Sequence, residues 1–571
     1  MTKTNSLPEL SGAQIILESL HAEGVDTVFG YPGGASLQIY DALHADDRIT
    51  HVLTRHEQAA AHAADGYART RNRPGVVFTT SGPGATNIVT GLANAYMDSV
   101  PVVAITAQVA SPLLGKDSFQ EADIVGITIP ITKYSYLVRD VRDLARVIRE
   151  AFHIATSGRP GPVLIDIPKD VTIARTAFSY PPAMDLPGFG AEPEPDEAQI
   201  KTALEYLGKA RRPLLFVGGG VRSAGAVTEV RKLADTLDLP VAWSLMGKGV
   251  IPDSDPRNIG MVGMHGMACA NYAFGECDLL LGIGVRFDDR VTGKTSGFAR
   301  QARIIHVDID AAEIGKIVPV ALGIRGNART VVSRMLEKLA DASPVPDRSA
   351  WHGRLREWTE NHPLSYRQTD VIKPQYVIET LNAITGGRAY ASTEVGQNQM
   401  WSAQYLAVHA PEQFVSSGGL GTMGFGLPAA VGMQIARPGD LVVSLSGDGS
   451  FQMNLQELQT IRERDLPVKI LILNNGCLGM VRQWQDLFYE KRYSCTVFEG
   501  QPDFVKLAEA YGIPARRIVD PGEVREALEA ALSEAGPYLL DFVVDKEENV
   551  FPMVPAGGAL DEMLRGEGGT G

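Results

Sequence analysis

LVVSLSGDGS, at residues 441–450, decides the fold of this chain: an apolar strand pattern ends in a glycine-flanked acid, Asp448. A second apolar run, ILIL at residues 470–473, ends in the pair Asn474 and Asn475, and twenty-six residues lie between Asp448 and Asn475. An acid and an amide that each follow a predicted strand suit Mg²⁺, which takes few protein oxygens and completes its shell with phosphate. The glycines allow the backbone to approach such a phosphate closely. Without the second run, GDG would equally fit a plain turn after a strand.

Apolar runs of strand length alternate with amphipathic helical stretches along the whole chain. The runs lie at residues 75–80, 102–106 and 163–167, then at 214–217, 279–283 and 304–309, and finally at 441–446, 468–474 and 538–544. Strands that alternate with helices form parallel α/β sheets. Two proline-rich stretches, at residues 180–195 and 343–347, divide the runs into three groups. We therefore predict three doubly wound parallel-sheet α/β domains, at residues 8–180, 196–342 and 370–550.

Length, charge and cysteine usage limit the kinds of function. A chain of 571 residues is long enough for three or four domains, and 44% hydrophobic with 21% charged residues is ordinary for a globular enzyme. The formal net charge of −14 argues against nucleic acid or an anionic membrane as the main partner. No run of about 18 apolar residues predicts a membrane span. The four cysteines form no CxxC pair and residues 1–9 lack a signal-peptide core, so we expect a cytoplasmic protein.

A closely packed helix is predicted in the first domain by RHEQAAAHAADGYAR at residues 55–69. Glu57 stands at the start of this helix, where an acid complements the helix dipole. Composition alone therefore leaves two interpretations of Glu57 open, a helix-terminal charge and a functional acid.

Several longer strings carry a family resemblance. They are FGYPGGAS (29–36), TSGPGATN (80–87), DSFQE (117–121), DIPKD (166–170), GMHG (263–266), GVRFDDRVTGK (284–294), SGGLGTMGFGLP (417–428) and LGMVRQW (478–484). With Glu57 and the GDG and NN motifs, they make the chain resemble the thiamine-diphosphate enzymes, and among these the catalytic subunits of the acetohydroxyacid synthase family. The resemblance runs from about residue 10 to about residue 560, and the order and spacing of the strings make it specific.

The resemblance implies a carboligating synthase. Thiamine diphosphate would decarboxylate pyruvate, and the hydroxyethyl carbanion would add to pyruvate, giving 2-acetolactate, or to 2-ketobutyrate, giving 2-aceto-2-hydroxybutyrate. These are the first common intermediates in the biosynthesis of valine, leucine and isoleucine. The resemblance also implies Mg²⁺, an FAD with no redox role, and a homodimer or tetramer whose sites lie between subunits. It leaves open a small regulatory subunit as a further partner.

The resemblance assigns roles to three residues of the first domain. Glu57 would hydrogen-bond N1′ of the aminopyrimidine ring and so activate the cofactor. Gln120 and Lys169 would line the substrate channel. A charge at the entry of a helix is the plain alternative for Lys169.

Two further residues are candidates for recognition of the acceptor keto acid. Arg290 would fork onto its carboxylate, and the indole of Trp484 would favour the ethyl group of 2-ketobutyrate over the methyl group of pyruvate. The plain alternatives are an ion pair of Arg290 with Asp288 or Asp289 and ordinary core packing of Trp484.

The same resemblance implies a site for thiamine diphosphate and its metal. The metal ligands would be Asp448, Asn475 and the backbone carbonyl of Cys477. Met423 would hold the cofactor in a bent V shape, and simple packing is the plain alternative for it. Asn398 departs from the family, in which histidine is usual, although an amide can still donate and accept hydrogen bonds. The implied residues of the thiamine-diphosphate site are Glu57, Gln397, Asn398, Gly421, Met423, Gly447, Asp448, Gly449, Asn475 and Met480.

The middle group of strands has features of a dinucleotide site. VGGG at residues 217–220 follows a strand, and IIHVDID at 304–310 places Asp308 near the end of another. Because the GxGxxG fingerprint is absent, a plain α/β turn explains VGGG equally well. The string at 284–294 instead resembles the FAD-binding branch of the family. The implied FAD residues are Arg159, Gly219, Gly220, Met264, His265, Arg286, Asp288, Arg290, Asp308 and Ile309.

Other functions remain as alternatives to the synthase. A pyruvate oxidase or decarboxylase on the same fold would pass electrons to flavin or a proton to the product, and Arg290 and Trp484 argue against it. A glyoxylate carboligase lacks the activating glutamate that is present here as Glu57. A non-catalytic regulatory paralogue would not need an intact Glu57, Asp448 and Asn475.

Overall fold

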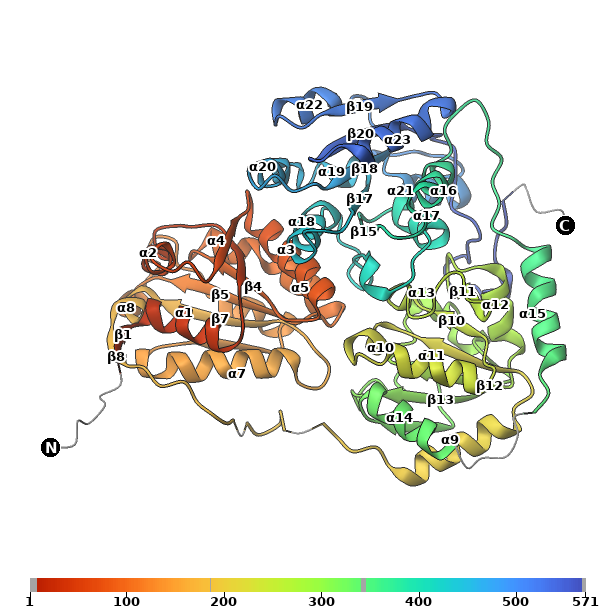
Figure 1. The fold of residues 1–571 in the computed structure, drawn as a ribbon, viewed down its shortest axis with the longest axis horizontal. Helices are drawn as coiled ribbons and strands as arrows, with labels where there is room; N and C mark the ends of the chain where they lie inside the picture. The colour runs from red at the N-terminus through yellow and green to blue at the C-terminus, as the bar shows by residue number, and fades with distance from the viewer. Residues whose placement is uncertain (1–7, 185, 191, 340–345, 567–571) are drawn as a thin grey trace.

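The computed structural model describes residues 8–184, 186–190, 192–339 and 346–566. Figure 1 shows three lobes, each built on a β-sheet with helices packed against it. Each of the three large sheets has six strands, and every strand pair within these sheets is parallel. The prediction of three doubly wound α/β domains is confirmed. The predicted break at 343–347 lies largely outside the described residues, and the exact domain boundaries stay a prediction.

The first sheet has the order β3-β2-β4-β5-β7-β6. Its strands are β2 (Thr27–Gly30), β3 (Thr50–Leu53), β4 (Gly75–Thr79), β5 (Val102–Gln108), β6 (Tyr134–Leu137) and β7 (Val163–Pro168). Its helices are α1 (Gly12–Ala22), α2 (Leu37–His44), α3 (Glu57–Arg71), α4 (Pro83–Asn87), α5 (Val89–Met97), α6 (Ile124–Thr128), α7 (Leu144–Thr156) and α8 (Lys169–Ile173). In α7, apolar residues recur every three or four positions, and the face with Leu144, Ile148 and Ala151 is buried against the sheet. A short antiparallel pair, β1 (Glu9–Ser11) with β8 (Arg175–Ala177), was not predicted.

The middle sheet has the order β11-β10-β9-β12-β13-β14. Its strands are β9 (Pro213–Val217), β10 (Val241–Trp243), β11 (Asn258–Met261), β12 (Leu279–Ile283), β13 (Arg303–Asp308) and β14 (Leu322–Arg325). Its helices are α9 (Glu197–Lys209), α10 (Gly219–Ser223), α11 (Val227–Thr236), α12 (Ala268–Glu276), α13 (Asp289–Thr292) and α14 (Ala328–Leu339). Helix α15 (Ser349–Asn361) lies against α12 at the edge of this lobe (Figure 1), where Trp351 and Trp358 join its core.

The third sheet has the order β16-β15-β17-β18-β20-β19. Its strands are β15 (Tyr390–Thr393), β16 (Phe414–Val415), β17 (Val442–Gly447), β18 (Lys469–Asn474), β19 (Ala515–Ile518) and β20 (Tyr538–Val543). Its helices are α16 (Pro374–Thr385), α17 (Gln397–Tyr405), α18 (Gly426–Ala436), α19 (Asp448–Phe451), α20 (Leu458–Glu463), α21 (Gly479–Phe488), α22 (Phe504–Ala510) and α23 (Val524–Ser533). After β20 the chain returns to the middle lobe, whose core includes Val554 and Leu560. Within the described residues, no helix combines the length and apolarity that a membrane crossing requires.

The strand orders point to the places where ligands bind. Numbered along the chain within each sheet, the first and third sheets run 2-1-3-4-6-5, whereas the middle sheet runs 3-2-1-4-5-6, the order of dinucleotide-binding Rossmann folds. Open parallel sheets bind ligands beyond the carboxyl ends of the strands, where the strand order reverses. That point lies between β9 and β12 in the middle sheet and between β15 and β17 in the third.

Helices α3 and α18 join the first and third lobes through direct backbone contact (Figure 1). A Cβ atom added at Gly432 of α18 would lie 1.9 Å from the carbonyl oxygen of Ala63. One added at Gly66 of α3 would lie 2.4 Å from the carbonyl oxygen of Ala429. Both glycines are therefore required for the helices to approach this closely.

Candidate active site and cofactor cavities

The predicted metal motif lies on the edge formed by the carboxyl ends of β15, β17 and β18. Asp448 is the first residue of α19, directly after β17, and Asn475 directly follows β18. Both line one small cavity together with Gly447, Gly449 and Cys477. The structure therefore brings together the residues that the two sequence motifs singled out.

The environment of Asp448 fits a cation. Asp448 is 1% exposed, and its donors are neutral: the side-chain amide of Gln501 and the backbone N–H groups of Gly449 and Gly476. Burial raises the pKa of Asp448 to about 7. A buried carboxylate without a cationic partner is costly, so a metal ion would compensate its charge. Within the described part of the chain, no group of three or more His, Cys, Asp or Glu side chains is suited to a metal. A carboxylate and an amide oxygen are ligands that fit Mg²⁺, which completes its shell with phosphate.

A chain of side-chain amides orients Asn475. Its Nδ2 donates to Oε1 of Gln397 at 3.1 Å, and Nε2 of Gln397 donates to Oε1 of Gln483 at 2.9 Å. The amide nitrogen of Asn475 is thereby used, and its Oδ1 accepts from the backbone N–H of Cys477 at 3.2 Å. Because an amide oxygen has two lone pairs, Oδ1 can still bind a metal. Nδ2 of Asn398 donates to the carbonyl oxygens of Glu394 and Leu445, both at 3.1 Å. Asn398 thus lines the small cavity while its donor nitrogen holds the ends of two strands.

A second, much larger cavity of about 1320 Å³ adjoins the small one. Met423 and Met480 line both cavities, whereas Gly421 lines only the large one. All the predicted thiamine-diphosphate residues other than Glu57 therefore line one or both of the two cavities.

The large cavity extends across the reversal point of the middle sheet. Gly219 and Gly220 follow β9, Arg286 and Asp288 follow β12, and Asp308 ends β13. The structure brings together all ten predicted FAD residues, which are Arg159, Gly219, Gly220, Met264, His265, Arg286, Asp288, Arg290, Asp308 and Ile309.

Polar groups in this cavity fit a dinucleotide. Asp308 stands at a strand end, where Rossmann folds hold a ribose with an acid, and burial raises its pKa to about 6. His265 is buried, and its Nδ1 has no hydrogen-bond partner among the described residues, which leaves it free for a ligand. Arg159 reaches in from the first lobe, and its guanidinium donates to Ser99 of that lobe and to Glu313 of the middle lobe.

The two candidates for acceptor recognition also line the large cavity. Arg290 meets Asp289 only at 3.8 Å between side chains that are 62% and 82% exposed, so this ion pair is weak and leaves the guanidinium available. Asp288 instead accepts from the backbone of Arg290 and caps α13. Trp484 lies on α21 with its ring edge-to-face to Phe488 at 5.8 Å, and it is not a core residue.

Three candidates from the first lobe lie apart from these cavities. Glu57, Gln120 and Lys169 line neither the large nor the small cavity. Glu57 is 9% exposed and accepts a hydrogen bond from Nδ2 of Asn87 at 2.9 Å. A Cβ at Gly84 would lie 3.3 Å from Oε1 of Glu57, and one at Gly82 would lie 2.8 Å from the carbonyl oxygen of Gln120. The loop after β4 therefore contacts both Glu57 and Gln120, while Lys169 begins α8 directly after β7.

Glu457 supports the segment that carries Glu57, and no sequence motif indicated it. Its Oε1 accepts from the backbone N–H of Arg55 at 2.8 Å, and its Oε2 accepts from Thr460 at 2.7 Å. Burial raises the pKa of Glu457 to about 7. A carboxyl group from the third lobe thus fixes the approach to α3.

We expect Glu457→Gln to stabilise the protein increasingly with pH. The folded pKa of about 7 exceeds the ordinary value of 4.5, so the wild-type contribution is complete below pH 4.5 and is lost as pH rises through 7. Glutamine stays neutral, and the stability difference should grow by about 1.4 kcal/mol per pH unit between pH 5 and 7. Urea unfolding at pH 5, 6, 7 and 8 measures it. Glu463→Gln, at a half-exposed carboxylate of α20, is the control, and parallel curves for the two variants would contradict the prediction.

Comparison with known proteins decides the family. The acetolactate synthase large subunit of Parasynechococcus marenigrum is 48% identical over 98% of this chain and 92% of the relative. The chain belongs to the acetolactate synthase large-subunit family. An acetolactate synthase of Mycobacterium bovis is 48% identical over 99% of this chain and 93% of its own length. The chloroplastic acetolactate synthase 1 of Oryza sativa is 48% identical over 98% of this chain and 88% of its own length.

The three lobes match the three parts of thiamine pyrophosphate enzymes. The N-terminal TPP-binding domain matches residues 10–127, the central domain matches 200–335, and the C-terminal TPP-binding domain matches 394–542. The first and third lobes, which share one strand order, both match TPP-binding domains, and the middle lobe with the Rossmann order matches the central domain. The recognition of the family from the sequence is confirmed.

Proposed function

We propose that the protein condenses two 2-keto acids with loss of carbon dioxide: pyruvate with pyruvate, giving 2-acetolactate, or with 2-ketobutyrate, giving 2-aceto-2-hydroxybutyrate. The supporting observation is one cavity system in which the metal motif of the third sheet, the dinucleotide edge of the middle sheet, Arg290 and Trp484 meet. When bound, thiamine diphosphate supplies the carbanion chemistry that releases carbon dioxide. The products are those of the first common step of branched-chain amino-acid biosynthesis.

The residues divide the work of binding and orientation. Asp448, Asn475 and the carbonyl of Cys477 would hold Mg²⁺ against the diphosphate, and Met423 would set the bend of the cofactor. Glu57 would hold a proton against N1′ of the aminopyrimidine ring. Arg290 would orient the carboxylate of the acceptor. FAD in the large cavity would complete the wall of the site without taking part in electron transfer.

A second copy of the chain would complete the site. Glu57 and Gln120 lie outside both cavities, although their proposed roles require contact with the cofactor and the substrate. A homodimer, or a tetramer made of two such dimers, would place Glu57 of one subunit beside Asp448 of the other. Because the relatives are named large subunits, we also propose a small regulatory subunit as a partner.

Product analysis tests the proposed function. Purified protein is supplied with thiamine diphosphate, Mg²⁺ and FAD, and then with pyruvate alone or with pyruvate and 2-ketobutyrate. We expect both acetohydroxy acids, in amounts that match the carbon dioxide released. Carbon dioxide with acetaldehyde or peroxide, and without an acetohydroxy acid, would instead identify a decarboxylase or oxidase.

We expect Trp484→Leu to reduce the preference for 2-ketobutyrate over pyruvate by about tenfold, since one methylene in an apolar site is worth about 1–3 kcal/mol. Leucine keeps an apolar wall but removes the indole face from the cavity. Competition between the two acceptors at fixed concentrations measures the product ratio. Phe488→Leu is the control. It replaces the ring that packs on Trp484, but Phe488 itself does not line the cavity, so the product ratio should stay near that of the wild type. If Trp484→Leu gave the same product ratio as Phe488→Leu, Trp484 would have no role in acceptor recognition.

A further inference from the structure

A buried group of charges lies between the first and third lobes, outside the residues assigned above. The side chains of Arg69, Asp65 and Asp98 are 0% exposed. Nε of Arg69 donates to Asp65 at 2.5 Å, and Nη2 of Arg69 donates to Asp98 at 2.9 Å. Arg69 and Asp65 belong to α3, whereas Asp98 follows α5. Two buried acids on one arginine are costly to desolvate, so this cluster calls for an explanation beyond packing.

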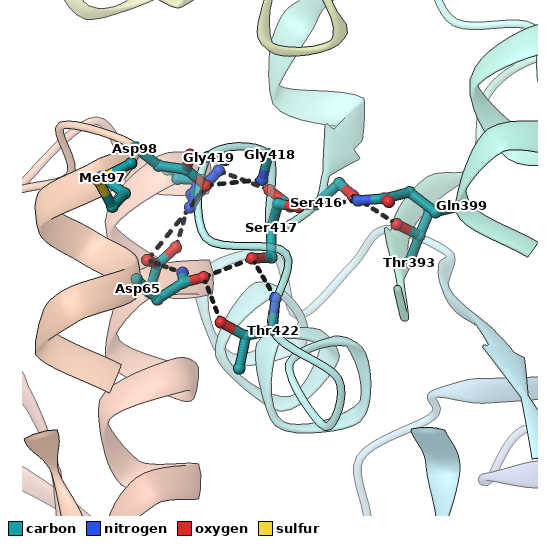
Figure 2. Close-up of polar contacts among 12 residues, drawn as sticks. Asp65, Met97, Asp98, Thr393, Gln399, Ser416, Ser417, Gly418, Gly419 and Thr422 are labelled. Atoms are coloured by element: carbon teal, nitrogen blue, oxygen red, sulfur yellow. Dashed lines mark hydrogen bonds and ion pairs between the residues drawn. The ribbon is translucent and has the colours of Figure 1, made fainter. Parts of the chain in front are cut away.

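Asp98 holds a loop of the third lobe. Its Oδ1 accepts from the backbone N–H of Gly419 at 2.7 Å, and its Oδ2 accepts from that of Gly418 at 3.0 Å (Figure 2). Hydrogen bonds to a charged acceptor are about twice as strong as neutral ones. A Cβ at Gly419 would lie 3.0 Å from Oδ1 of Asp98 and 3.1 Å from Nη2 of Arg286, so the backbone is seated closely against both.

Asn94 also binds this loop, through two side-chain hydroxyl groups. Its Oδ1 accepts from the hydroxyl of Ser417 at 2.5 Å and from the hydroxyl of Thr422 at 3.1 Å. The hydroxyl of Ser417 also accepts from the backbone N–H of Thr422 at 2.8 Å (Figure 2). Since Nδ2 of Asn94 donates to Asp65 at 3.1 Å, the loop and the buried charges form one network.

This loop, residues 417–423, forms part of the wall of both cavities. Gly418 and Gly419 line the large cavity, and Met423 lines both. The residues beside Asp98 hold flavin candidates: the carbonyl of Met97 accepts from Arg286 at 2.8 Å, and the hydroxyl of Ser99 accepts from Arg159 at 2.8 Å. Asp98 lines the large cavity but not the small one. Any effect of Asp98 on the diphosphate site must therefore pass through the loop.

We propose that Asp98 is a positioning residue that fixes loop 417–423, and that through this loop FAD and thiamine diphosphate strengthen each other's binding. The inference rests on the proposed function for the identity of the two cofactors. A ligand in the large cavity packs against Gly418 and Gly419 and so keeps the loop on Asp98. The same seat fixes Met423 at the second cavity. Coupling of this kind is reciprocal, because each ligand then binds a loop that the other has already ordered. This gives a flavin that transfers no electrons a role at the catalytic cofactor.

Calorimetric titration of full-length protein with thiamine diphosphate, at saturating Mg²⁺ and with or without saturating FAD, tests the proposal. In the wild type we expect FAD to lower the Kd of thiamine diphosphate about fivefold or more. In Asp98→Asn, one amide cannot accept from Gly418, Gly419 and Arg69 together. We expect its Kd to rise about tenfold, as for loss of a hydrogen bond to a charged group, and FAD to change it less than twofold. If Asp98 had a merely structural role, the variant would have a lower Tm, but the ratio of the Kd of thiamine diphosphate without FAD to that with FAD would stay as in the wild type.

Two companion variants keep the outcomes distinct. Asp26→Asn removes a half-exposed carboxylate that pairs with Arg71 of α3 away from the loop, and it should keep the wild-type ratio. Thr422→Val removes one bond to Asn94 without altering either cavity lining, and it should reduce the ratio even where Asp98→Asn does not fold. A wild type in which FAD leaves the Kd unchanged, or an Asp98→Asn variant with the wild-type ratio, overturns the proposal. A wild type that binds no thiamine diphosphate instead overturns the proposed function.

Discussion

Replacing Glu57 by glutamine should reduce acetohydroxy-acid formation by about 10²–10⁴-fold, the range for loss of a positioned general acid–base group. Glutamine has nearly the same shape, and its carbonyl oxygen can still accept the hydrogen bond from Asn87. The fold should therefore survive, and the loss should appear in kcat more than in the KM for pyruvate. Initial rates of acetolactate formation, with saturating cofactors, measure the effect.

The control for this variant is another glutamate of the first lobe. Glu18→Gln removes a surface carboxylate that pairs with Arg48, and it should retain the wild-type rate. If Glu57→Gln kept more than a tenth of the wild-type kcat, Glu57 would be only a charge at the start of α3. Activity restored by mixing Glu57→Gln with Asp448→Asn subunits would also show that one site uses both subunits.

Replacing Asp448 by asparagine should weaken Mg²⁺ binding by at least about 100-fold, because even residues that only orient metal ligands cost about 10–100-fold. Activity should fall in parallel and recover only partly at high Mg²⁺. Titration of Mg²⁺ in the presence of thiamine diphosphate measures the affinity. Asp143→Asn, at a half-exposed residue of the first lobe, serves as the control.

Stability distinguishes loss of the metal from misfolding in Asp448→Asn. The folded pKa of Asp448 is about 7, above its ordinary value of 3.8, so the stabilising contribution of the neutral acid is complete below pH 3.8 and lost as pH rises through 7. Asparagine is neutral at every pH. Without metal at pH 8, the variant should therefore be at least as stable as the wild type in urea. A variant that is less stable under these conditions would point to a structural role of the charge.

The parts of the fold that the sequence predicted are those with one dominant physical signal. The central strands β4, β5, β12, β17 and β18 are buried on both faces, so most of their residues are apolar or small. Short strands such as β10 and β16, with three and two residues, carry too few positions for a pattern. The strand orders depend on contacts between distant segments, which periodicity does not record.

The residues of the candidate site likewise fall into those that the sequence predicted and those that only the fold reveals. Asp448, Asn475 and the flavin candidates stand directly after predicted strands, and the structure collects them at the reversal points of their sheets. Gln501 is 53 positions from Asp448 and belongs to no motif, so only the fold reveals its contact. Asp98 and Glu457 act on backbone N–H groups of other lobes, and such contacts leave no trace in local sequence. The strained backbone of Gln120, with φ of 60°, likewise appears only in three dimensions.

The contact of Gly66 with Ala429 and of Gly432 with Ala63 limits how the protein can be rebuilt or can move. Interdigitated backbones allow neither sliding nor hinge rotation between α3 and α18 without a clash. A chimaera that takes the first lobe from one parent and the third from another would have to inherit both helices from the same parent. Directed evolution of this protein therefore has to keep the contact between α3 and α18.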